Sequence, residues 1–326
     1  MIKQSTSEDA NLQYMIIGAG GCGGSIGAFL AYGGKDVYFI ARGRHKEAMA
    51  HGGLSMKTTS RGNFTITPVM VFDEEEYLRK AERGILKKPD IIFVCVKFYS
   101  LEALVPFLQK ISDEHTVIIP ILNVYGTGRL LSERLPGPLV TDGCIYIAAE
   151  IESPGCVVQK GDIFRVVYGV RDKKDERPIL GKVAGDLVEC GIEGIWSDNI
   201  SKDGLQKFSL ISPMAACGAF YDVRIGAVQT PGKERETFSA LVEEIAALGR
   251  AMDISLPEDI VQINLGLIDS LLPDACASMQ RDLWNQKPSE IQGLVYAVPE
   301  MAKKAGITLP IYEKIAETLR CRFQKQ

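Results

Sequence analysis

The chain has 326 residues, which exceeds one ordinary mixed α/β domain and suits two domains of roughly 100 to 200 residues each. Hydrophobic residues make up 46% and charged residues 24%, the balance of a globular protein rather than a disordered or fibrous one. The formal net charge is -4, so no overall positive field would attract nucleic acid or an anionic membrane. These values exclude a strongly basic nucleic-acid-binding protein and favour a small-molecule ligand.

Two features bear on the compartment. The uncharged run 15–34 contains eight glycines and is too weakly apolar for a membrane span, and the N-terminus lacks a basic segment followed by an apolar core. We therefore expect no secretory signal and a cytoplasmic protein. The eight cysteines show no Cys-x-x-Cys motif and no histidines at zinc-binding spacing, so we expect reduced, mostly buried thiols and no metal site.

The first half of the chain alternates short β-rich runs with helical segments, the pattern of a parallel sheet covered by helices. Residues 14–17 and 37–41 predict the first two strands. The almost wholly apolar runs 91–96 and 117–122 predict central strands buried on both faces. The remaining segments predict a hairpin (54–59 with 64–71), a helix (74–86) and two later strands (140–149 and 163–170).

The composition changes near residues 196–199, after which β-rich runs disappear. Residues 234–252, 258–271 and 288–305 each carry apolar residues at i, i+3 and i+4 spacing, which is typical of amphipathic helices. We therefore predict a doubly wound α/β domain over residues 1–198 and an all-helical domain over residues 199–326. The apolar faces of the helical domain are compatible with a homodimer.

A glycine-rich loop joins the first predicted strand to a helix, and its motif G-x-G-x-x-G comprises Gly18, Gly20 and Gly23. In this context the first glycine permits a tight turn, the second lets the backbone approach a pyrophosphate, and the third allows close helix–strand packing. The helix N-terminus would face the phosphates. The motif predicts a Rossmann-like dinucleotide-binding domain.

The end of the second predicted strand decides between the two nicotinamide cofactors. NAD-binding domains place an acidic residue there to bind the ribose hydroxyls, whereas this chain has Arg42 and Arg44. A guanidinium at this point would bind the 2′-phosphate of NADP(H), which we therefore expect as the cofactor. The alternative is that both arginines are solvated loop charges.

The chain has only three histidines, and none suits the histidine proton donor of many 2-hydroxy-acid dehydrogenases. His45 and His51 follow the second strand, and His115 precedes a strand, at the edge of the sheet away from the cofactor. We therefore expect a lysine or tyrosine as proton donor and exclude a Ser/His/Asp hydrolase.

With these pieces in view, the chain resembles the ketopantoate reductases (2-dehydropantoate 2-reductases) from Tyr14 to about Arg320. The resemblance rests on motifs in the family's order and spacing. They are the loop Gly18-Ala19-Gly20-Gly21-Cys22-Gly23, Arg42, Val-Cys-Val-Lys97, Asn123, Lys207, Ser278-Met-Gln-Arg-Asp, Lys-Pro-Ser-Glu290-Ile-Gln-Gly and Gly306-Ile-Thr-Leu-Pro310.

The resemblance implies NADPH-dependent reduction of ketopantoate to pantoate, for pantothenate and coenzyme A synthesis, in a cleft between the domains. Lys207 would donate the proton to the substrate oxygen, and Asn123 and Glu290 would complete the catalytic set. Lys207, Asn123 and Ser278 would bind the substrate. The implied cofactor contacts are the six loop residues from Gly18 to Gly23, with Arg42, Lys97, Asn123 and Glu290.

Each of these side chains also has an ordinary structural interpretation. Lys97 could be a solvated strand-end cation, and Asn123 could form a turn. Lys207 lies in an apolar segment and could extend from a helix edge to solvent. Glu290 is predicted in the first turn of its helix, where a plain N-terminal charge or capping role is the alternative.

The chain departs from the family four and eight residues after Lys207, where family members show asparagines and this chain has Ile211 and Ala215. Polar contacts to a substrate hydroxyl carry much of an enzyme's discrimination, so these changes affect the substrate more than the hydride transfer. Two alternatives therefore remain: a reductase of a different, more apolar 2-keto acid, and a non-catalytic NADP(H)-binding protein.

Overall fold

The computed structural model describes residues 11–323, and residue packing divides them into two compact units. Unit 1 contains residues 11–96, 100–122 and 126–200. Unit 2 contains residues 97–99, 123–125 and 201–323. The segment in which we expect no secretory signal, residues 1–10, lies outside the described residues.

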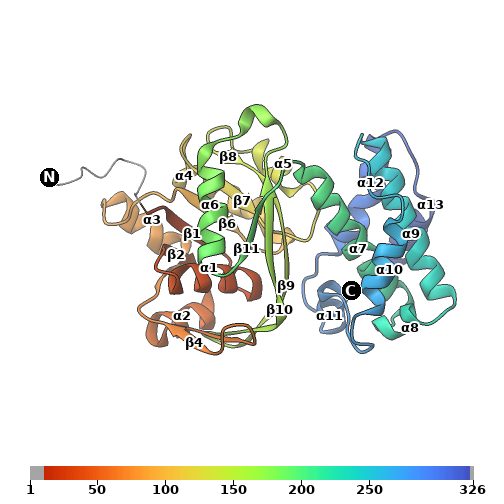
Figure 1. Ribbon diagram of the computed structural model, residues 1–326, viewed down its shortest axis with the longest axis horizontal. Helices are drawn as coiled ribbons and strands as arrows, with labels where there is room; N and C mark the ends of the chain where they lie inside the picture. The colour runs from red at the N-terminus through yellow and green to blue at the C-terminus, as the bar shows by residue number, and fades with distance from the viewer. Residues whose placement is uncertain (1–10, 324–326) are drawn as a thin grey trace. The chain divides into compact units, whose positions relative to one another are not determined.

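A parallel six-stranded sheet with the order β5-β2-β1-β6-β7-β8 forms the core of unit 1 (Figure 1). The central strands β1 (Gln13–Ile17), β6 (Ile91–Val94) and β7 (Val117–Pro120) are buried along their whole length, because their side chains alternate between two covered faces. The outer strands are β2 (Asp36–Ile40), β5 (Met70–Phe72) and β8 (Leu139–Val140). This sheet, followed by a helical unit, confirms the predicted fold class.

Helices α1 to α5 of unit 1 alternate along the chain with the strands of the parallel sheet. Phe29 on the first of them is buried and stacks edge-on against Phe164, which ties this helix to a second, smaller sheet. The six helices are α1 (Gly21–Tyr32), α2 (Gly43–Gly52), α3 (Glu74–Glu82), α4 (Leu101–Ile111), α5 (Thr127–Ser132) and α6 (Pro178–Glu189). One short 3₁₀ turn of unit 1 lies at Lys173–Asp175, and another, Phe98–Ser100, includes two residues of the unit 2 segment 97–99.

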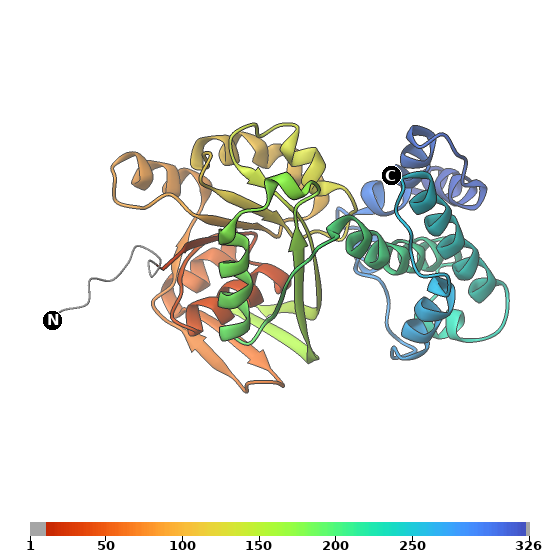
Figure 2. The same ribbon diagram turned by 45° about the horizontal axis from the view of Figure 1, so that its top comes forward.

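The second sheet is built on a long antiparallel ribbon of β9 (Asp142–Ser153) and β10 (Cys156–Gly169), seen in green in Figure 2. β10 also pairs in parallel with β3 (Leu54–Thr58) and β11 (Glu193–Trp196). The predicted hairpin is present, because β3 pairs antiparallel with β4 (Phe64–Ile66).

The predicted strand over residues 64–71 is wrong as a single element. Pro68 lacks the N–H that a continuous ladder needs, and the chain divides around it. Ile66 ends β4 in the second sheet, and Met70 begins β5 in the parallel sheet.

Unit 2 is helical apart from its two short segments 97–99 and 123–125. Its core gathers apolar side chains from most of its helices, with Leu205, Phe238 and Tyr312 fully buried. The helices are α7 (Ile200–Tyr221), α8 (Ile225–Gln229), α9 (Lys233–Ala251), α10 (Ile260–Asp269), α11 (Ser278–Trp284), α12 (Ala297–Lys304) and α13 (Pro310–Phe323).

The predicted helix over residues 288–305 starts later and is irregular. Helical structure begins at Ile291, and a π-helical segment, Gln292–Tyr296, precedes α12. Gly293 lies in this segment, and a Cβ there would come within 2.5 Å of Val124. Close packing of this backbone against the 123–125 segment therefore accompanies the irregular turn.

All eight cysteines are free thiols, as expected, but only Cys144, Cys190 and Cys217 are fully buried, so the expectation of mostly buried thiols is wrong. Cys321 is exposed near the end of α13. Between residues 11 and 323, no helix combines the length and apolar character that a membrane crossing requires.

Candidate active-site residues in the two units

The glycine loop of unit 1 has the geometry that its motif requires. Gly18 has a φ of +94°, and a Cβ on it would lie 2.9 Å from the carbonyl oxygen of Cys95. A Cβ on Gly23 would lie 2.2 Å from the carbonyl oxygen of Gly18, so only glycine allows this close packing of α1 on the loop. At Gly20, by contrast, no heavy atom of the described residues other than those of its immediate chain neighbours lies within 4 Å of the Cβ position. The loop is therefore open at the residue expected to approach a pyrophosphate.

The N-terminus of α1 carries no competing charge. Gly20 is its N-cap, no side chain caps it, and its first turn has no acidic residue. The aligned N–H groups and the helix dipole favour an anion at such an end. Of the other loop residues, Ala19 is buried, Gly21 packs against the backbone of Ala149, and Cys22 lies in the first turn of α1. These features fit a dinucleotide pyrophosphate.

Arg42 is the N-cap of α2, two residues after the end of β2, and its side chain is 74% exposed. Its guanidinium forms an ion pair with Glu74, the first residue of α3. The arginine therefore stands at the end of the second strand, as expected, but it is not simply solvated. Sequence reasoning missed Glu74, which comes next to Arg42 because β5 and β2 are neighbours in the sheet.

In unit 2, Lys97 and Glu290 form the most buried ion pair of the predicted site. The Lys97 Nζ lies 3.2 Å from Glu290 Oε2 and 3.3 Å from Asp282 Oδ2. Glu290 is 3% exposed, and its other oxygen accepts a 3.1 Å hydrogen bond from the Phe98 N–H. Burial alone would lower the pKa of Lys97, but the carboxylates of Glu290 and Asp282 outweigh it and the pKa is raised. Lys97 is therefore a cation at neutral pH.

Glu290 was expected in the first turn of a helix but lies immediately before it. Its carbonyl oxygen accepts hydrogen bonds from the N–H groups of Gly293 and Leu294, whereas its carboxylate reaches Lys97 and Phe98. The side chain therefore connects the helix start to the segment after β6 instead of capping its own helix.

Lys207 lies on α7 and is 7% exposed. Its Nζ donates a 3.0 Å hydrogen bond to the Asn123 side-chain oxygen, although 84 residues separate the two in the sequence. A buried lysine with a polar amide partner is a suitable proton donor to an adjacent carbonyl oxygen. The structure thus brings together two of the residues predicted as catalytic.

Ser278 is the exposed first residue of α11. Asp282 follows one helical turn later, so both side chains lie on the same face of this helix. Because Asp282 contacts Lys97, that face is directed toward the Lys97 segment. No function was assigned to Asp282 from the sequence. Its spacing of four residues from Ser278, which places both on one helix face, could have identified it as a candidate.

The two departures from the family pattern lie one and two turns after Lys207 on α7. Ala215 is fully buried and Ile211 is half-buried, and both belong to the apolar packing of unit 2. Positions i, i+4 and i+8 share a helix face. The face that carries Lys207 is therefore apolar beyond it.

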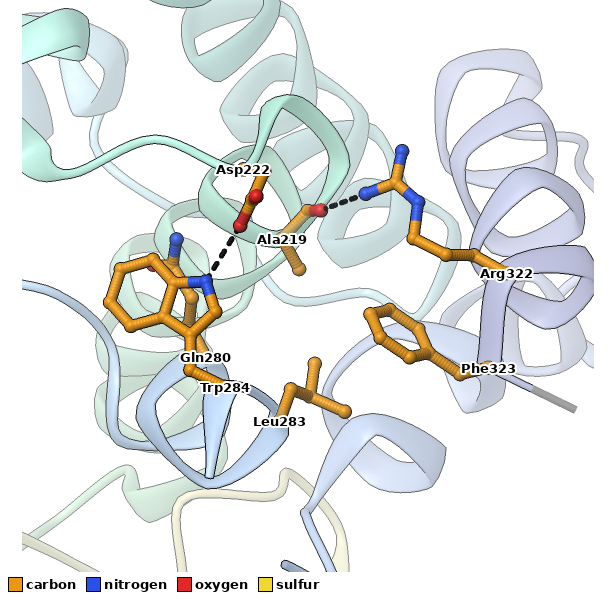
Figure 3. A pocket seen from close by; sticks show the side chains of 7 residues that line it. All are labelled: Ala219, Asp222, Gln280, Leu283, Trp284, Arg322 and Phe323. Atoms are coloured by element: carbon orange, nitrogen blue, oxygen red, sulfur yellow. Dashed lines mark hydrogen bonds between the residues drawn. The ribbon is translucent and has the colours of Figure 1, made fainter. Parts of the chain in front are cut away.

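A separate pocket of about 360 Å³ lies at the other end of α7 (Figure 3). At its rim the Trp284 indole N–H donates a 2.6 Å hydrogen bond to Asp222. None of the predicted site residues lines this pocket, so it contributes nothing to the site described above. Its walls are formed by Ala219, Asp222, Gln280, Leu283, Trp284, Arg322 and Phe323.

A parallel sheet with an open glycine loop, followed by a helical unit with a buried lysine, is an arrangement that suits a dinucleotide-dependent oxidoreductase. The family model described as Ketopantoate reductase PanE/ApbA matches residues 14–173, and the model of its C-terminal part matches residues 199–322. The chain belongs to the ketopantoate reductase family, whose members are oxidoreductases that depend on a pyridine nucleotide.

Individual relatives are distant but cover nearly the whole chain. The uncharacterized oxidoreductase YkpB of Bacillus subtilis is 25% identical, over 95% of this chain and 98% of its own. The 2-dehydropantoate 2-reductase structure from Methylococcus capsulatus has a TM-score of 0.84 at 22% identity, covering 96% of this chain and 97% of that one. A D-mandelate dehydrogenase bound to NADH and anilino(oxo)acetate has a TM-score of 0.80 at 21% identity, covering 95% and 98%. At these identities the two structures establish the fold alone.

Proposed function

We propose that the protein reduces ketopantoate to pantoate with NADPH, a step toward pantothenate and coenzyme A. The observation that carries this proposal is the buried Lys207 Nζ, 3.0 Å from Asn123, in a member of the ketopantoate reductase family. In this proposal residues 1–198 bind the nucleotide, and residues 199–326 supply the substrate contacts and the dimer interface.

The residues of unit 1 fit NADP(H). The open position at Gly20 and the uncapped start of α1 suit the pyrophosphate, and the exposed Arg42 suits the 2′-phosphate. When bound, the reduced nicotinamide supplies the hydride to the keto carbon. In the proposal the cofactor contacts are Gly18, Ala19, Gly20, Gly21, Cys22, Gly23, Arg42, Lys97, Asn123 and Glu290.

Lys207 handles the proton in this reaction. As the keto carbon accepts the hydride, its oxygen gains negative charge, and the Lys207 ammonium stabilises that charge and transfers one proton to it. The oxygen becomes the hydroxyl of the product and Lys207 becomes a neutral amine, which solvent protonates again. Asn123 orients Nζ through its side-chain oxygen, and Ser278 offers its hydroxyl to the substrate carboxylate.

A second candidate function is the reduction of a more apolar 2-keto acid. The supporting observation is the apolar face of α7 beyond Lys207, where Ile211 and Ala215 replace the asparagines that family members show. Side chains without hydrogen-bonding groups cannot recognise the hydroxyl of ketopantoate, and discrimination of substrates depends on such contacts.

The test is the rate of NADPH oxidation with ketopantoate, 2-oxoisovalerate and phenylglyoxylate, repeated with NADH. We expect the highest kcat/KM with ketopantoate and NADPH. A higher kcat/KM with one of the apolar keto acids would instead support the second candidate. Tight NADPH binding without oxidation in the presence of any 2-keto acid would contradict both and indicate a non-catalytic NADP(H)-binding protein.

A further inference from the structure

His45 lies on α2, three residues after Arg42, and is half-buried. Its Nε2 lies 2.8 Å from the carbonyl oxygen of Ala19 in the glycine loop. Its Nδ1 accepts a 3.1 Å hydrogen bond from the N–H of Gly155, in the turn between β9 and β10. One imidazole ring therefore joins three segments of unit 1: the glycine loop, α2 and the β9–β10 turn.

The two hydrogen bonds define the protonation state of the ring. Nδ1 must be unprotonated to accept from Gly155, so the single proton of a neutral imidazole lies on Nε2, which donates to Ala19. A charged imidazolium would carry N–H groups on both nitrogens, and its Nδ1–H would face the N–H of Gly155. Burial lowers the pKa of His45, and the hydrogen bond to Ala19 opposes this shift only in part. The neutral form is thus the one that fits.

The contact between His45 and the Ala19 carbonyl also orients the N–H group of the same peptide unit. The peptide unit from Ala19 to Gly20 is planar and trans, so its C=O and N–H point in opposite directions. With the Ala19 oxygen held toward His45, the Gly20 N–H is directed to the other side of the loop. Gly20 is the N-cap residue of α1, and its surroundings are open. His45 therefore orients a backbone donor of the glycine loop.

Several charged side chains on the elements around His45 form ion pairs with other residues. Arg42 pairs with Glu74 on α3, and Lys46 lies 2.6 Å from Asp73 and 3.0 Å from Glu76. The titratable and charged groups on the adjoining elements are Arg42 at the N-cap of α2, Arg44, Lys46, Glu47 and His51 on α2, Cys22 on α1, Asp73, Glu74 and Glu76 at the start of α3, and Glu152 and Cys156 beside the β9–β10 turn. Lys57 pairs with Glu152. The two influences on the pKa of His45 are burial, which lowers it, and the hydrogen bond to Ala19, which raises it.

We propose that His45 is a positioning residue for nucleotide binding: its neutral ring holds the Ala19 carbonyl against the β9–β10 turn and so directs the Gly20 N–H toward the pyrophosphate. This inference rests on the proposed function, because it assumes that the loop binds a dinucleotide. It predicts that nucleotide affinity falls when His45 is protonated, while the chemical step is unaffected.

The test compares nucleotide binding by wild type, His45→Phe and His45→Gln across pH, with His51→Gln as the matched control. His51 lies on the same helix, and its Nδ1 lies 2.7 Å from the carbonyl oxygen of Glu47, one turn earlier on that helix, and not near the glycine loop's Ala19 carbonyl, which His45 contacts. Calorimetric titration gives Kd for NADP⁺ and NAD⁺, and steady-state assays give kcat and KM. The glutamine introduced by His45→Gln retains an N–H donor for Ala19 but cannot take a proton, so it separates the hydrogen bond from the titration.

For His45→Phe we expect Kd to rise about tenfold at neutral pH, as loss of one buried hydrogen bond allows, with kcat changed less than about twofold. The wild-type Kd should rise as the pH falls toward about 5, and that of His45→Gln should change less. The 2′-phosphate of NADP⁺ also titrates in this range, but it affects both proteins equally and is absent from NAD⁺.

Two results would overturn the inference alone: a wild-type protein that binds nucleotide while His45→Phe binds it equally well, or parallel pH profiles for wild type and His45→Gln. If His45→Phe does not fold, as judged by circular dichroism, the pH profile of His45→Gln decides. A wild-type protein that binds neither nucleotide would overturn the proposed function and this inference together.

Discussion

The two units present their candidate groups by different means. In unit 1 the glycine loop offers backbone, and each of Gly18, Gly20 and Gly23 matters through the side chain that it lacks. In unit 2 the candidate groups are side chains held in pairs, Lys207 with Asn123 and Lys97 with Glu290. The first design needs only a local sequence of strand, turn and helix. The second needs helices to bring together groups that are 84 and 193 residues apart.

This difference implies that changes in the two units should have separable effects. Substitutions in the loop should change nucleotide affinity or the packing of unit 1. Substitutions at the side-chain pairs should change turnover or the stability of unit 2. The four predictions below test that separation.

The largest effect is expected for Lys207→Ala. Loss of a positioned proton donor typically reduces rates by about 10²- to 10⁴-fold, so kcat should fall in that range while the Kd for NADPH remains within about twofold. Stopped-flow measurement of NADPH oxidation under single-turnover conditions separates this step from product release. Lys202→Ala, on the same helix, is the control and should retain turnover. Near-normal kcat in Lys207→Ala would remove this lysine from the mechanism.

Gly20→Ala and Gly23→Ala form a matched pair within one loop. The added methyl at residue 23 would lie 2.2 Å from the Gly18 oxygen and 2.8 Å from the Cys95 Cβ, so we expect a loss of about 1–3 kcal/mol in the free energy of unfolding. At residue 20 the methyl has room, so stability should stay within about 0.5 kcal/mol while NADPH affinity falls. Urea unfolding and nucleotide titration measure both. Equal destabilisation by the two variants would contradict this account of the loop.

Glu290→Gln tests the ion pair with Lys97. Removing one partner of a buried pair costs about 3–5 kcal/mol, but Lys97 is 38% exposed and keeps Asp282, so we expect about 1–2 kcal/mol. The pKa of Lys97 is raised in the folded state. The contribution of the ion pair to folding stability is therefore fully present below the ordinary lysine pKa, and it is lost only as the pH rises through the raised value.

The loss of stability caused by Glu290→Gln should therefore have its full size at neutral pH and become smaller at strongly alkaline pH. Asp282→Asn serves as the control, because Asp282 is more exposed than Glu290 and should lose less stability. Thermal unfolding followed by circular dichroism at several pH values measures both variants. A larger loss for Asp282→Asn would reverse the assignment of the main partner.

Arg42→Ala should have the smallest effect and the most selective one. An exposed guanidinium contributes modestly to the binding of a phosphate group. We therefore expect the KM for NADPH to rise about five- to tenfold and the KM for NADH to stay unchanged. Arg44→Ala, two residues further on, is the control. Steady-state assays with both nucleotides give the ratio of KM values, and an equal rise for NADH would exclude 2′-phosphate recognition by Arg42.

The sequence predicted the parallel sheet well because its signals are local. Apolar runs such as 91–96 and 117–122 mark buried strands directly, and the glycine motif marks the turn after the first strand. The split at Pro68 was missed because alternation continues across it, although the strands on its two sides join different sheets. The choice of sheet depends on partners far away in the sequence.

Of the candidate site, the sequence predicted the residues better than their partners. The sequence predicts Lys97, Asn123, Lys207 and Glu290 as candidate residues, whereas only the structure shows that they lie in pairs. Asp282 and Glu74 were missed because isolated acidic residues on helices are usually solvated. Only the packing of α11 and the adjacency of β5 to β2 bring them to Lys97 and Arg42.

The division of the chain has a practical consequence for recombining this protein with its relatives. The segments Lys97–Tyr99 and Asn123–Tyr125 follow strands of unit 1 but pack within unit 2. The continuous part of unit 2 begins later, at Ser201. A fragment cut at residue 199 would lack Asn123, and Glu290 would lose both Lys97 and the Phe98 N–H. A chimera that exchanges the helical unit should therefore transplant these two tripeptides with it, although they lie about 75 to 100 residues upstream of the apparent junction.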